Sequence, residues 1–327
     1  PGRGLLALRE AIAAWYLRRY SASFDVEQEV IVTMGAKEGI SHLCLALLDR
    51  GDYVVAPDPC YPIHEGAPGI AGASVVGYAS GPGHEPAEAL AKAFDYVLQI
   101  KKTPIVVNDS RGFFTSRVFG TFTNEGLAML GEGVSAAMIE NEARKAGMPV
   151  GPLAISDEVS MSLQEHIRQQ TIKDLAAEGK QMPDHPAYAV VDAMLKEFNR
   201  AGKAAGAGFY EYPQGGKKFL WPELKARFEK ADAQISQEDV RDRILFIQAI
   251  ETVRCLEENV LLSVADANIG SIFGIGFAAW TGGALQFINQ YGVKDFVARA
   301  QYLAEQYGER FLPPALLLEK AAKGETF

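Results

Sequence analysis

The pattern of hydrophobic and polar residues indicates two differently built parts. Residues 5–20 repeat apolar positions at helical spacing, with Leu5, Leu8, Ile12 and Trp15 on one stripe, which predicts an amphipathic helix. The pattern then predicts a buried strand at 29–34, a turn at 35–37, a helix at 38–48 and a second strand at 53–56. This order begins an α/β sheet that lacks its remaining strands.

Residues 79–86 (ASGPGHEP) contain two prolines and two glycines without periodicity, which predicts a linker. Residues 90–98 then indicate a helix and residues 104–107 a short strand, and almost every later segment has helical spacing. We therefore predict a mainly α protein preceded by a partial α/β fragment at 1–78.

A distant internal repeat runs through the helical part, with a period of about 126–131 residues. The repeated positions are Glu125 and Glu251, Leu130 and Leu256, Glu132 and Glu258, Ser135 and Ser263, Gly147 and Gly276, and Gly151 and Gly282. We expect two related helical units packed on each other, at 87–232 and 233–327.

The composition narrows the class of protein. A formal net charge of −9 over 327 residues argues against a nucleic-acid binder, which would present a basic patch. Three widely spaced cysteines, Cys44, Cys60 and Cys255, indicate neither a disulfide framework nor a metal site. The chain has no apolar run long enough for a membrane span and no signal-peptide pattern, so we expect a cytoplasmic protein. Its first residue is proline, which suggests a fragment or a processed chain.

Four segments of the helical part resemble 3-hydroxyacyl-CoA dehydrogenases in order and approximate separation. They are KKTPIVVNDSRGFFTSR (101–117), NEGLAMLGEGV (124–134), GMPVGPLAISDEVS (147–160) and GKAAGAGFYEY (202–212). Residues 242–288 resemble the extra C-terminal repeat of the multifunctional fatty-acid oxidation proteins. The resemblance implies a helical C-terminal dehydrogenase domain in two repeats, an acyl-CoA substrate, NAD as cofactor and oxidation of 3-hydroxyacyl-CoA in β-oxidation.

The same resemblance implies the candidate site. Ser116 stands where the family usually has a catalytic-site asparagine, and a hydroxyl can still hydrogen-bond, though with one donor and a shorter reach. The residues implied to bind substrate are Asn108, Arg117, Met148, Pro149, Gly151 and Pro152. A serine that only caps a helix, and a simple loop between helices at 147–152, are the structural alternatives.

In this family a dinucleotide-binding domain binds NAD and supplies the catalytic histidine, and the sequence has no counterpart of that domain. A dinucleotide fold needs a glycine-rich turn between a strand and a helix, and no GxGxxG occurs. Of five histidines, only His185 precedes a proline as the family's base does, and it follows a predicted loop. We therefore expect the chain to be inactive alone.

Residues 1–78 resemble class I/II pyridoxal-phosphate aminotransferases of the alanine and LL-diaminopimelate type, through PGRGLLALREAIAAWY and VTMGAKEGISHLCLALLDRGDYVVAPDPCYPIH. The resemblance places Ala36 and Lys37 at the cofactor phosphate and Tyr61 against the pyridine ring. Such enzymes carry their Schiff-base lysine later in the chain, after the point where this sequence changes family. Packing of Tyr61 on Pro62 is the simpler alternative.

Two other functions stay open beside an incomplete dehydrogenase: a non-enzymatic helical module for binding or oligomerisation, and an aminotransferase remnant. A homodimer and a complex with a complementary subunit are both compatible with the sequence. A natural fusion, a gene-assembly artefact and a designed join would each produce the same order of segments.

Overall fold

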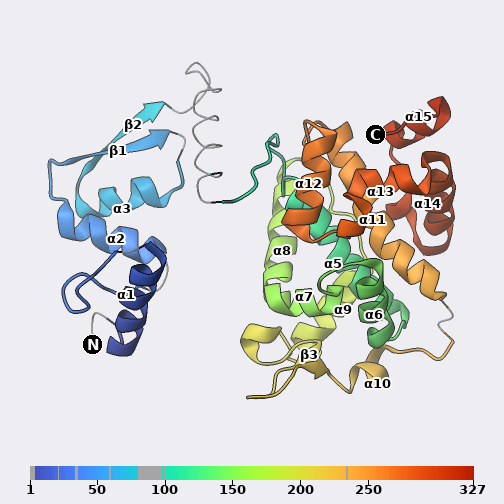
Figure 1. The fold of residues 1–327 in the computed structure, drawn as a ribbon, viewed down its shortest axis with the longest axis horizontal. Coiled ribbons are helices and arrows are strands. Elements are labelled where there is room, and N and C mark those ends of the chain that lie inside the picture. The colour runs from blue at the N-terminus through green and yellow to red at the C-terminus, as the bar shows by residue number, and fades with distance from the viewer. Residues whose placement is uncertain are drawn as a thin grey trace. The chain divides into compact units, whose positions relative to one another are not determined.

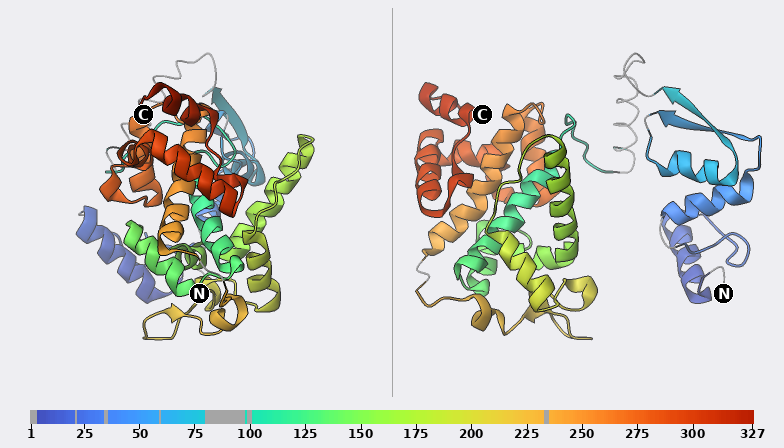
Figure 2. Two further views of the ribbon diagram at one scale, coloured as in Figure 1. Left: turned by 90° about the vertical axis from the view of Figure 1, so that its right-hand side faces the viewer. Right: turned by 180° about the vertical axis from the view of Figure 1, so that it is seen from behind.

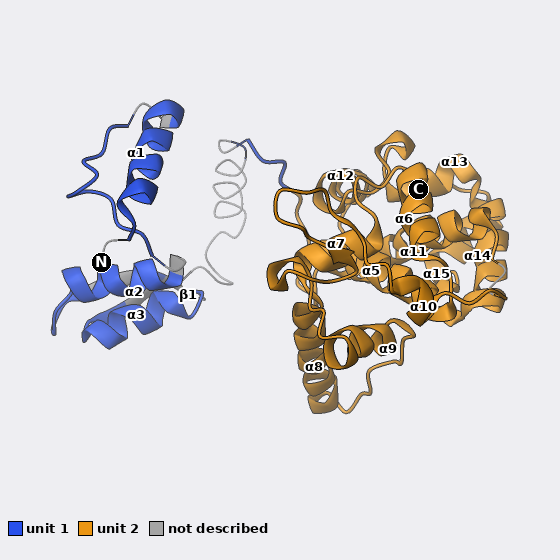
Figure 3. Ribbon diagram, turned by 90° about the horizontal axis from the view of Figure 1, so that it is seen from below, with its two compact units in different colours: residues 1–104 blue, residues 105–327 orange. Residues whose placement is uncertain are grey.

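The computed structural model describes residues 4–20, 22–33, 36–58, 60–79, 98, 101–232 and 235–327. Contacts between Cα atoms divide the chain into two compact units, Pro1–Pro104 and Ile105–Phe327 (Figure 3). The predicted linker at 79–86 and the helix predicted at 90–98 lie outside the described residues, except for Ala79 and Leu98. The predicted division of the helical part after residue 232 remains a prediction.

Among its described residues, the first unit contains a small parallel sheet and three helices of known bounds. Its elements are α1 (Leu6–Tyr20), α2 (Ala36–Leu47), β1 (Tyr53–Asp58), α3 (Ile63–Ala71) and β2 (Ser74–Ala79) (Figure 1). The strands pair in parallel from Tyr53 opposite Ser74 to Asp58 opposite Ala79. Parallel neighbours need a crossover connection, and α3 supplies it.

Two expectations for this unit are wrong. Residues 30–33 of the predicted strand at 29–34 have no regular structure, and Ile31 is 62% exposed. The reason is that β1 and β2 pair with each other, so the segment has no ladder partner among the described residues. The helix at the N-terminus forms, but Leu8 and Trp15 on its predicted stripe are exposed, while Arg9 and Ala13 are buried.

The second unit is built almost entirely from helices, which confirms the mainly α expectation (Figures 1 and 2). Its α-helices are α5 (Thr115–Glu132), α6 (Ala136–Ala146), α7 (Pro152–Val159), α8 (Met161–Ala177), α9 (Ala187–Asp192), α10 (Leu224–Phe228), α11 (Gln237–Glu257), α12 (Val264–Ile275), α13 (Ala284–Tyr291), α14 (Val293–Tyr307) and α15 (Ala315–Lys323). Its shorter elements are the π-helix η1 (Ala193–Glu197), the 3-10 turns η2 (Lys203–Ala205), η3 (Ala279–Thr281) and η4 (Glu309–Phe311), and the antiparallel strands β3 (Tyr210–Glu211) and β4 (Phe219–Leu220).

Helices α5 and α11 form the centre of this unit and pack against each other. The apolar side chains of Val118, Phe122 and Met129 on α5 are buried, as is that of Phe114 immediately before the helix. Phe113 differs, because it precedes the helix in a left-handed conformation (φ 47°) and is 51% exposed. The strand predicted at 104–107 is reduced to one bridge between Val107 and Leu261.

The internal repeat appears in the structure as reciprocal ion pairs between α5 and α11. Arg117 on α5 pairs with Glu251 (2.7 Å) and Glu258 (2.5 Å), and Arg243 on α11 pairs with Glu125 (2.6 Å) and Glu132 (2.5 Å). Arg243, Glu251 and Glu258 lie 126 positions after Arg117, Glu125 and Glu132, respectively. The two helices therefore present the same surface to each other.

Helix capping repeats in the same way. The Glu140 carboxylate on α6 accepts a hydrogen bond from the Leu153 amide at the start of α7 (2.8 Å). The Asn268 side-chain oxygen on α12 accepts one from the Leu285 amide at the start of α13 (3.0 Å). Both pairs satisfy amide groups that the first turn of a helix leaves without backbone partners.

Candidate functional site

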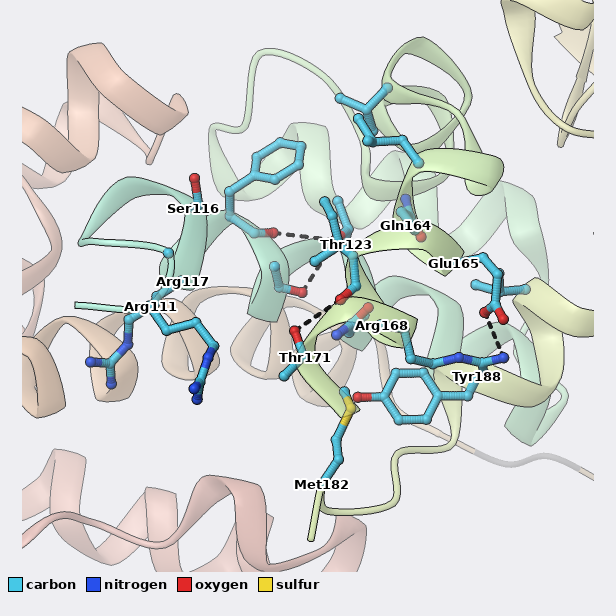
Figure 4. A pocket seen from close by; sticks show the side chains of 18 residues that line it. Arg111, Ser116, Arg117, Thr123, Gln164, Glu165, Arg168, Thr171, Met182 and Tyr188 are labelled. Carbon is cyan, nitrogen blue, oxygen red and sulfur yellow. Dashed lines mark hydrogen bonds and ion pairs between the residues drawn. The ribbon is translucent and has the colours of Figure 1, made fainter. Parts of the chain in front are cut away.

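A cavity of about 540 Å³ opens beside the first half of α5, with α8 forming its opposite wall (Figure 4). Most of its lining area is carbon, and polar side chains are placed around it. The side chains of Arg111, Ser116, Arg117, Gln164, Arg168 and Tyr188 are among the polar groups of its lining, and Gly120 on α5 also lines it.

The turn before α5 determines how Ser116 meets this cavity. Gly112 (φ 78°) and Phe113 (φ 47°) both have left-handed backbone conformations, which reverse the chain immediately before the helix. Phe114 follows and is buried to 1% exposure, so it anchors the start of α5 in the core. Ser116 then lies in the first turn, exposed and on the cavity wall. Its hydroxyl is accessible to a ligand.

Arg117, next to Ser116, also lines the cavity, but its side chain is bound by two glutamates of the second repeat. Its Nε donates to Glu251 (2.8 Å) and its terminal nitrogens donate to Glu258 (2.5 and 3.2 Å). Burial opposes its charge, yet the hydrogen bond to Glu258 and the charge of Glu251 raise the pKa of Arg117 above its usual value. Its contacts are those of a link between repeats, and substrate binding by Arg117 stays a prediction.

The wall formed by α8 was not predicted from the sequence. Arg168 pairs with Glu165 (2.5 Å) and Asp192 (2.8 Å), and its guanidinium lies over the Tyr188 ring at 5.0 Å from the centroid. The side-chain amide atoms of Gln164 are buried and have no hydrogen-bond partner among the described residues. A long helix rich in polar residues is usually a solvated surface helix, so its sequence alone does not indicate a cavity wall.

The structure places the remaining predicted substrate residues away from this cavity. Exposed Asn108 donates from its side chain to the Asn259 carbonyl (2.7 Å) and so joins the two repeats. Met148 is buried, with 4% of its surface exposed. Pro149 packs closely against Gly276, because a Cβ added to Gly276 would lie 2.9 Å from the Pro149 ring. These three residues make packing contacts, and their role in substrate binding stays a prediction.

The segment around Gly151 and Pro152 packs helices closely. A Cβ on Gly151 would lie 2.5 Å from the Glu140 carboxylate, and one on Gly126 would lie 2.3 Å from Pro152. This is the close backbone approach that glycine permits, and it gives these positions a structural reason independent of any ligand.

The loop of the GKAAGAGFYEY motif is held by one buried carboxylate. Asp157 on α7 accepts hydrogen bonds from the amides of Phe209 and Tyr210 (both 2.8 Å) and from the Tyr212 hydroxyl (2.9 Å). Burial raises the pKa of Asp157 even though these hydrogen bonds lower it. A Cβ on Gly208 would lie 1.9 Å from the carboxylate, which explains why this loop needs glycine there.

In the first unit the structure brings together two of the three residues assigned to pyridoxal phosphate. Lys37 lies in the first turn of α2, and its Nζ is 5.2 Å from the centroid of the Tyr61 ring. Ala36 is the first residue of that helix. Lys37 is the only lysine in residues 4–79, and the resemblance assigns it to the phosphate, so these residues do not supply a Schiff-base lysine as well.

The described residues also do not fit a dinucleotide. The connection from β1 to α3 passes through Cys60, Tyr61 and Pro62, whereas close approach of backbone amides to a pyrophosphate needs glycines at this turn. His185 is partly buried and its Nδ1 accepts from the Ala187 amide (3.2 Å). Burial lowers its pKa, and it is not among the residues that line the cavity.

The described residues show neither a metal-binding cluster nor a membrane-spanning helix. They contain no cluster of three or more histidine, cysteine, aspartate or glutamate side chains arranged to hold a metal ion. Within the same ranges, no helix combines the length and the apolar character that crossing a membrane requires.

Comparison with known proteins agrees with the division into two unrelated parts. Residues 112–212 match the family model for the C-terminal domain of 3-hydroxyacyl-CoA dehydrogenase, and residues 1–102 match the model for class I and II aminotransferases.

Two solved structures show the fold. The 3-hydroxybutyryl-CoA dehydrogenase of Escherichia coli K12 is similar with a TM-score of 0.58 and 15% identity, over 98% of this chain and 90% of that chain. The dehydrogenase part of multifunctional enzyme 1 from C. elegans has a TM-score of 0.52 and 22% identity, over 71% of this chain and 53% of that chain. The chain thus spans about half the length of the second structure. The fold of the helical part is therefore similar to that of 3-hydroxyacyl-CoA dehydrogenases.

Proposed function

We propose that residues 105–327 form the acyl-CoA-binding portion of an NAD-dependent 3-hydroxyacyl-CoA dehydrogenase of fatty-acid β-oxidation. The observation that carries the proposal is the largely apolar cavity beside α5, with the Ser116 hydroxyl on its wall. The family match over 112–212 includes this helix and every residue that lines the cavity except Arg111.

The cavity suits an acyl group chemically. An apolar lining with a few placed polar groups is the usual composition of a small-molecule site, because carbon contacts supply affinity and polar groups fix orientation. The acyl chain would occupy the carbon-lined space, and Ser116 would hydrogen-bond an oxygen near the thioester end. The bound NAD of such an enzyme accepts hydride, and no described residue of this chain is assigned to hold it.

We further propose that this chain does not oxidise its ligand alone, because its described residues provide neither a pyrophosphate turn nor a histidine at the cavity. The test is calorimetric titration of the purified chain with 3-hydroxyacyl-CoA, followed by an assay for NADH formation. Binding with no NADH is expected. Absence of any binding would refute the proposed function, and NADH formation would refute the proposed lack of activity.

Ser116 can be tested by paired variants. Ser116→Ala should weaken binding of a 3-hydroxyacyl-CoA by roughly 0.5–1.5 kcal/mol, the net contribution of one hydrogen bond. Ser116→Asn, which restores the residue usual in the family, should bind at least as tightly as the parent chain. Equal affinities of all three proteins would show that Ser116 does not contact the ligand.

The alternative of a non-enzymatic module for binding or oligomerisation has one observation in its favour. Helices α5 and α11 join through matched surfaces within a single chain. A surface of this kind also suits a homodimer or a complementary subunit, but here the second repeat already covers it. Sedimentation of the full chain would test this, and a monomer is the expected result for this face.

A further inference from the structure

The helices around the cavity have counterparts in the second repeat. Helices α7 and α13 both contain eight residues, and each is preceded by a glycine, Gly151 or Gly283. The structure thus pairs Gly151 with Gly283 and not, as the sequence alone predicts, with Gly282, which ends the turn η3. Each is followed by a residue with positive φ, Ser160 (72°) or Gly292 (91°), which begins the next helix. Gly283 lies 132 residues after Gly151, and Gly292 lies 132 residues after Ser160. The helices that follow, α8 and α14, therefore correspond to each other with the same offset of 132 residues.

In the second repeat the corresponding space is filled by aromatic rings. Phe246 on α11 stacks on Phe296 of α14, with ring centroids 4.0 Å apart and an interplanar angle of 3°. The rings of Phe287 and Tyr291 on α13 contact Phe246 edge-on at 5.7 and 5.1 Å. Phe246 and Phe296 are fully buried, so no ligand space is left between α11 and α14 at this point.

None of these rings has an aromatic counterpart in the first repeat. The position of Phe246 is held by Gly120, 126 residues earlier, and that of Phe296 by Gln164, 132 residues earlier. Phe287 and Tyr291 correspond to Ile155 and Val159. Gly120, Val159 and Gln164 all line the cavity.

The local geometry shows that the missing ring at Gly120 leaves open space. A Cβ built on Gly120 meets no atom within 4 Å, although the residue lies in the middle of a helix that packs closely elsewhere. Across the cavity, Gln164 also lines the space, and its side-chain amide atoms have no hydrogen-bond partner among the described residues. The cavity is therefore the unfilled version of the aromatic cluster in the second repeat.

We propose that Gly120 is the specificity-determining residue of the cavity: it admits the acyl chain past Ser116, and Phe246 closes the equivalent position in the second repeat. One chain therefore binds one acyl group, and the length accepted depends on the space beside Gly120. This inference rests on the proposed function for the identity of the ligand, while the space itself is independent of it.

The test uses the full chain with Gly120→Phe, which introduces the residue found at the corresponding position. The matched control is Gly69→Phe, because Gly69 also lies in a helix, is exposed and has no atom within 4 Å of a built Cβ. Gly120→Leu is a second variant in case the larger ring prevents folding. Butyryl-CoA and decanoyl-CoA are titrated against each protein by calorimetry, and protection against thermal unfolding by benzene is measured in parallel.

The parent chain and the control should bind decanoyl-CoA with a stoichiometry of one. In Gly120→Phe the affinity for decanoyl-CoA should fall at least about tenfold, since two methylene groups kept in water already account for that. Butyryl-CoA should bind nearly unchanged, and protection by benzene should be lost.

Other outcomes separate the two proposals. The role of Gly120 would be overturned if Gly120→Phe and Gly120→Leu bound decanoyl-CoA as tightly as the parent chain does. A stoichiometry of two for the parent chain would overturn it as well. If the parent chain binds neither CoA ester, the proposed function fails, and the benzene comparison then decides alone whether Gly120 opens the cavity.

Discussion

Arg117 and Arg243 make equivalent ion pairs in very different surroundings, which allows a direct test of how burial controls their contribution. The Arg243 side chain is fully buried, and so is its partner Glu125. The Arg117 side chain is 18% exposed, and its partner Glu258 is 51% exposed. Replacing each arginine with leucine removes the same chemical group from related positions.

Arg243→Leu should destabilise the helical unit by about 3–5 kcal/mol, because it leaves the buried carboxylate of Glu125 with fewer partners. Glu125 keeps Arg310, whose Nε donates to it at 2.6 Å, which places the expected value toward the lower end. Arg117→Leu should cost no more than about 1–2 kcal/mol, since water can solvate Glu258 once the arginine is gone and the less exposed Glu251 keeps its ion pair with Arg254 at 3.2 Å.

Urea unfolding followed by the helical circular dichroism signal would measure both losses. The pH dependence adds an independent readout. Burial alone would raise the pKa of Glu125, but the charge of Arg243 and the hydrogen bond from Arg310 hold it below its usual value. A carboxylate with a lowered folded-state pKa stabilises the fold above its unfolded pKa, and that stabilisation disappears as the pH falls through the folded value. Arg243→Leu should therefore lose less stability than the parent chain on acidification.

Equal losses for the two leucine variants at neutral pH would refute the argument from burial. An unchanged acid dependence in Arg243→Leu would show instead that Arg310 alone maintains the pKa of Glu125. Arg243→Lys serves as a further control, because it keeps the charge but not the paired donors of the guanidinium.

The structure supports three more stability predictions on α5, each checked by the same unfolding measurement. Gly126→Ala should destabilise by about 1–3 kcal/mol, since the added Cβ would lie 2.3 Å from Pro152. Gly120→Ala, in the same helix but with open space, should be neutral or stabilising by up to about 1 kcal/mol, and a loss equal to that of Gly126→Ala would contradict the open space. Phe122→Ala should cost about 3–5 kcal/mol, because the ring is only 4% exposed, and a loss below about 1 kcal/mol would show that the site readily collapses.

The helical unit could largely be predicted from its sequence because its signals are local. The apolar spacing of α5 predicts which face is buried, and Phe114, Val118 and Phe122 lie on that face. The recurrence of Glu125 and Glu132 at 251 and 258 predicts a repeat. The pattern does not show that each repeat supplies the arginine for the other's glutamates, because spacing along one chain contains no information about which surfaces meet.

The candidate site was only partly predictable for a related reason. Ser116 follows from a motif, and the structure places it on a cavity wall. Gly120 carries no such signal, since an isolated glycine in a helical pattern is ordinarily just a weak helix former. Its importance becomes visible only when α5 is compared with α11, where Phe246 fills the equivalent space.

The first unit shows the limit of local patterns most clearly. An alternating or helical spacing of apolar residues shows which face of a strand or helix would be buried. The spacing is the same whether or not the fold supplies a neighbouring element to bury that face. Ile31 and Trp15 carry such a pattern, yet they are 62% and 46% exposed. The segment at 29–34 therefore has the composition of a buried strand but not its structure, because strand formation depends on a neighbour's backbone. In contrast, β1 and β2 supply each other's hydrogen bonds through the crossover of α3, and the strand predicted at 53–56 forms as expected.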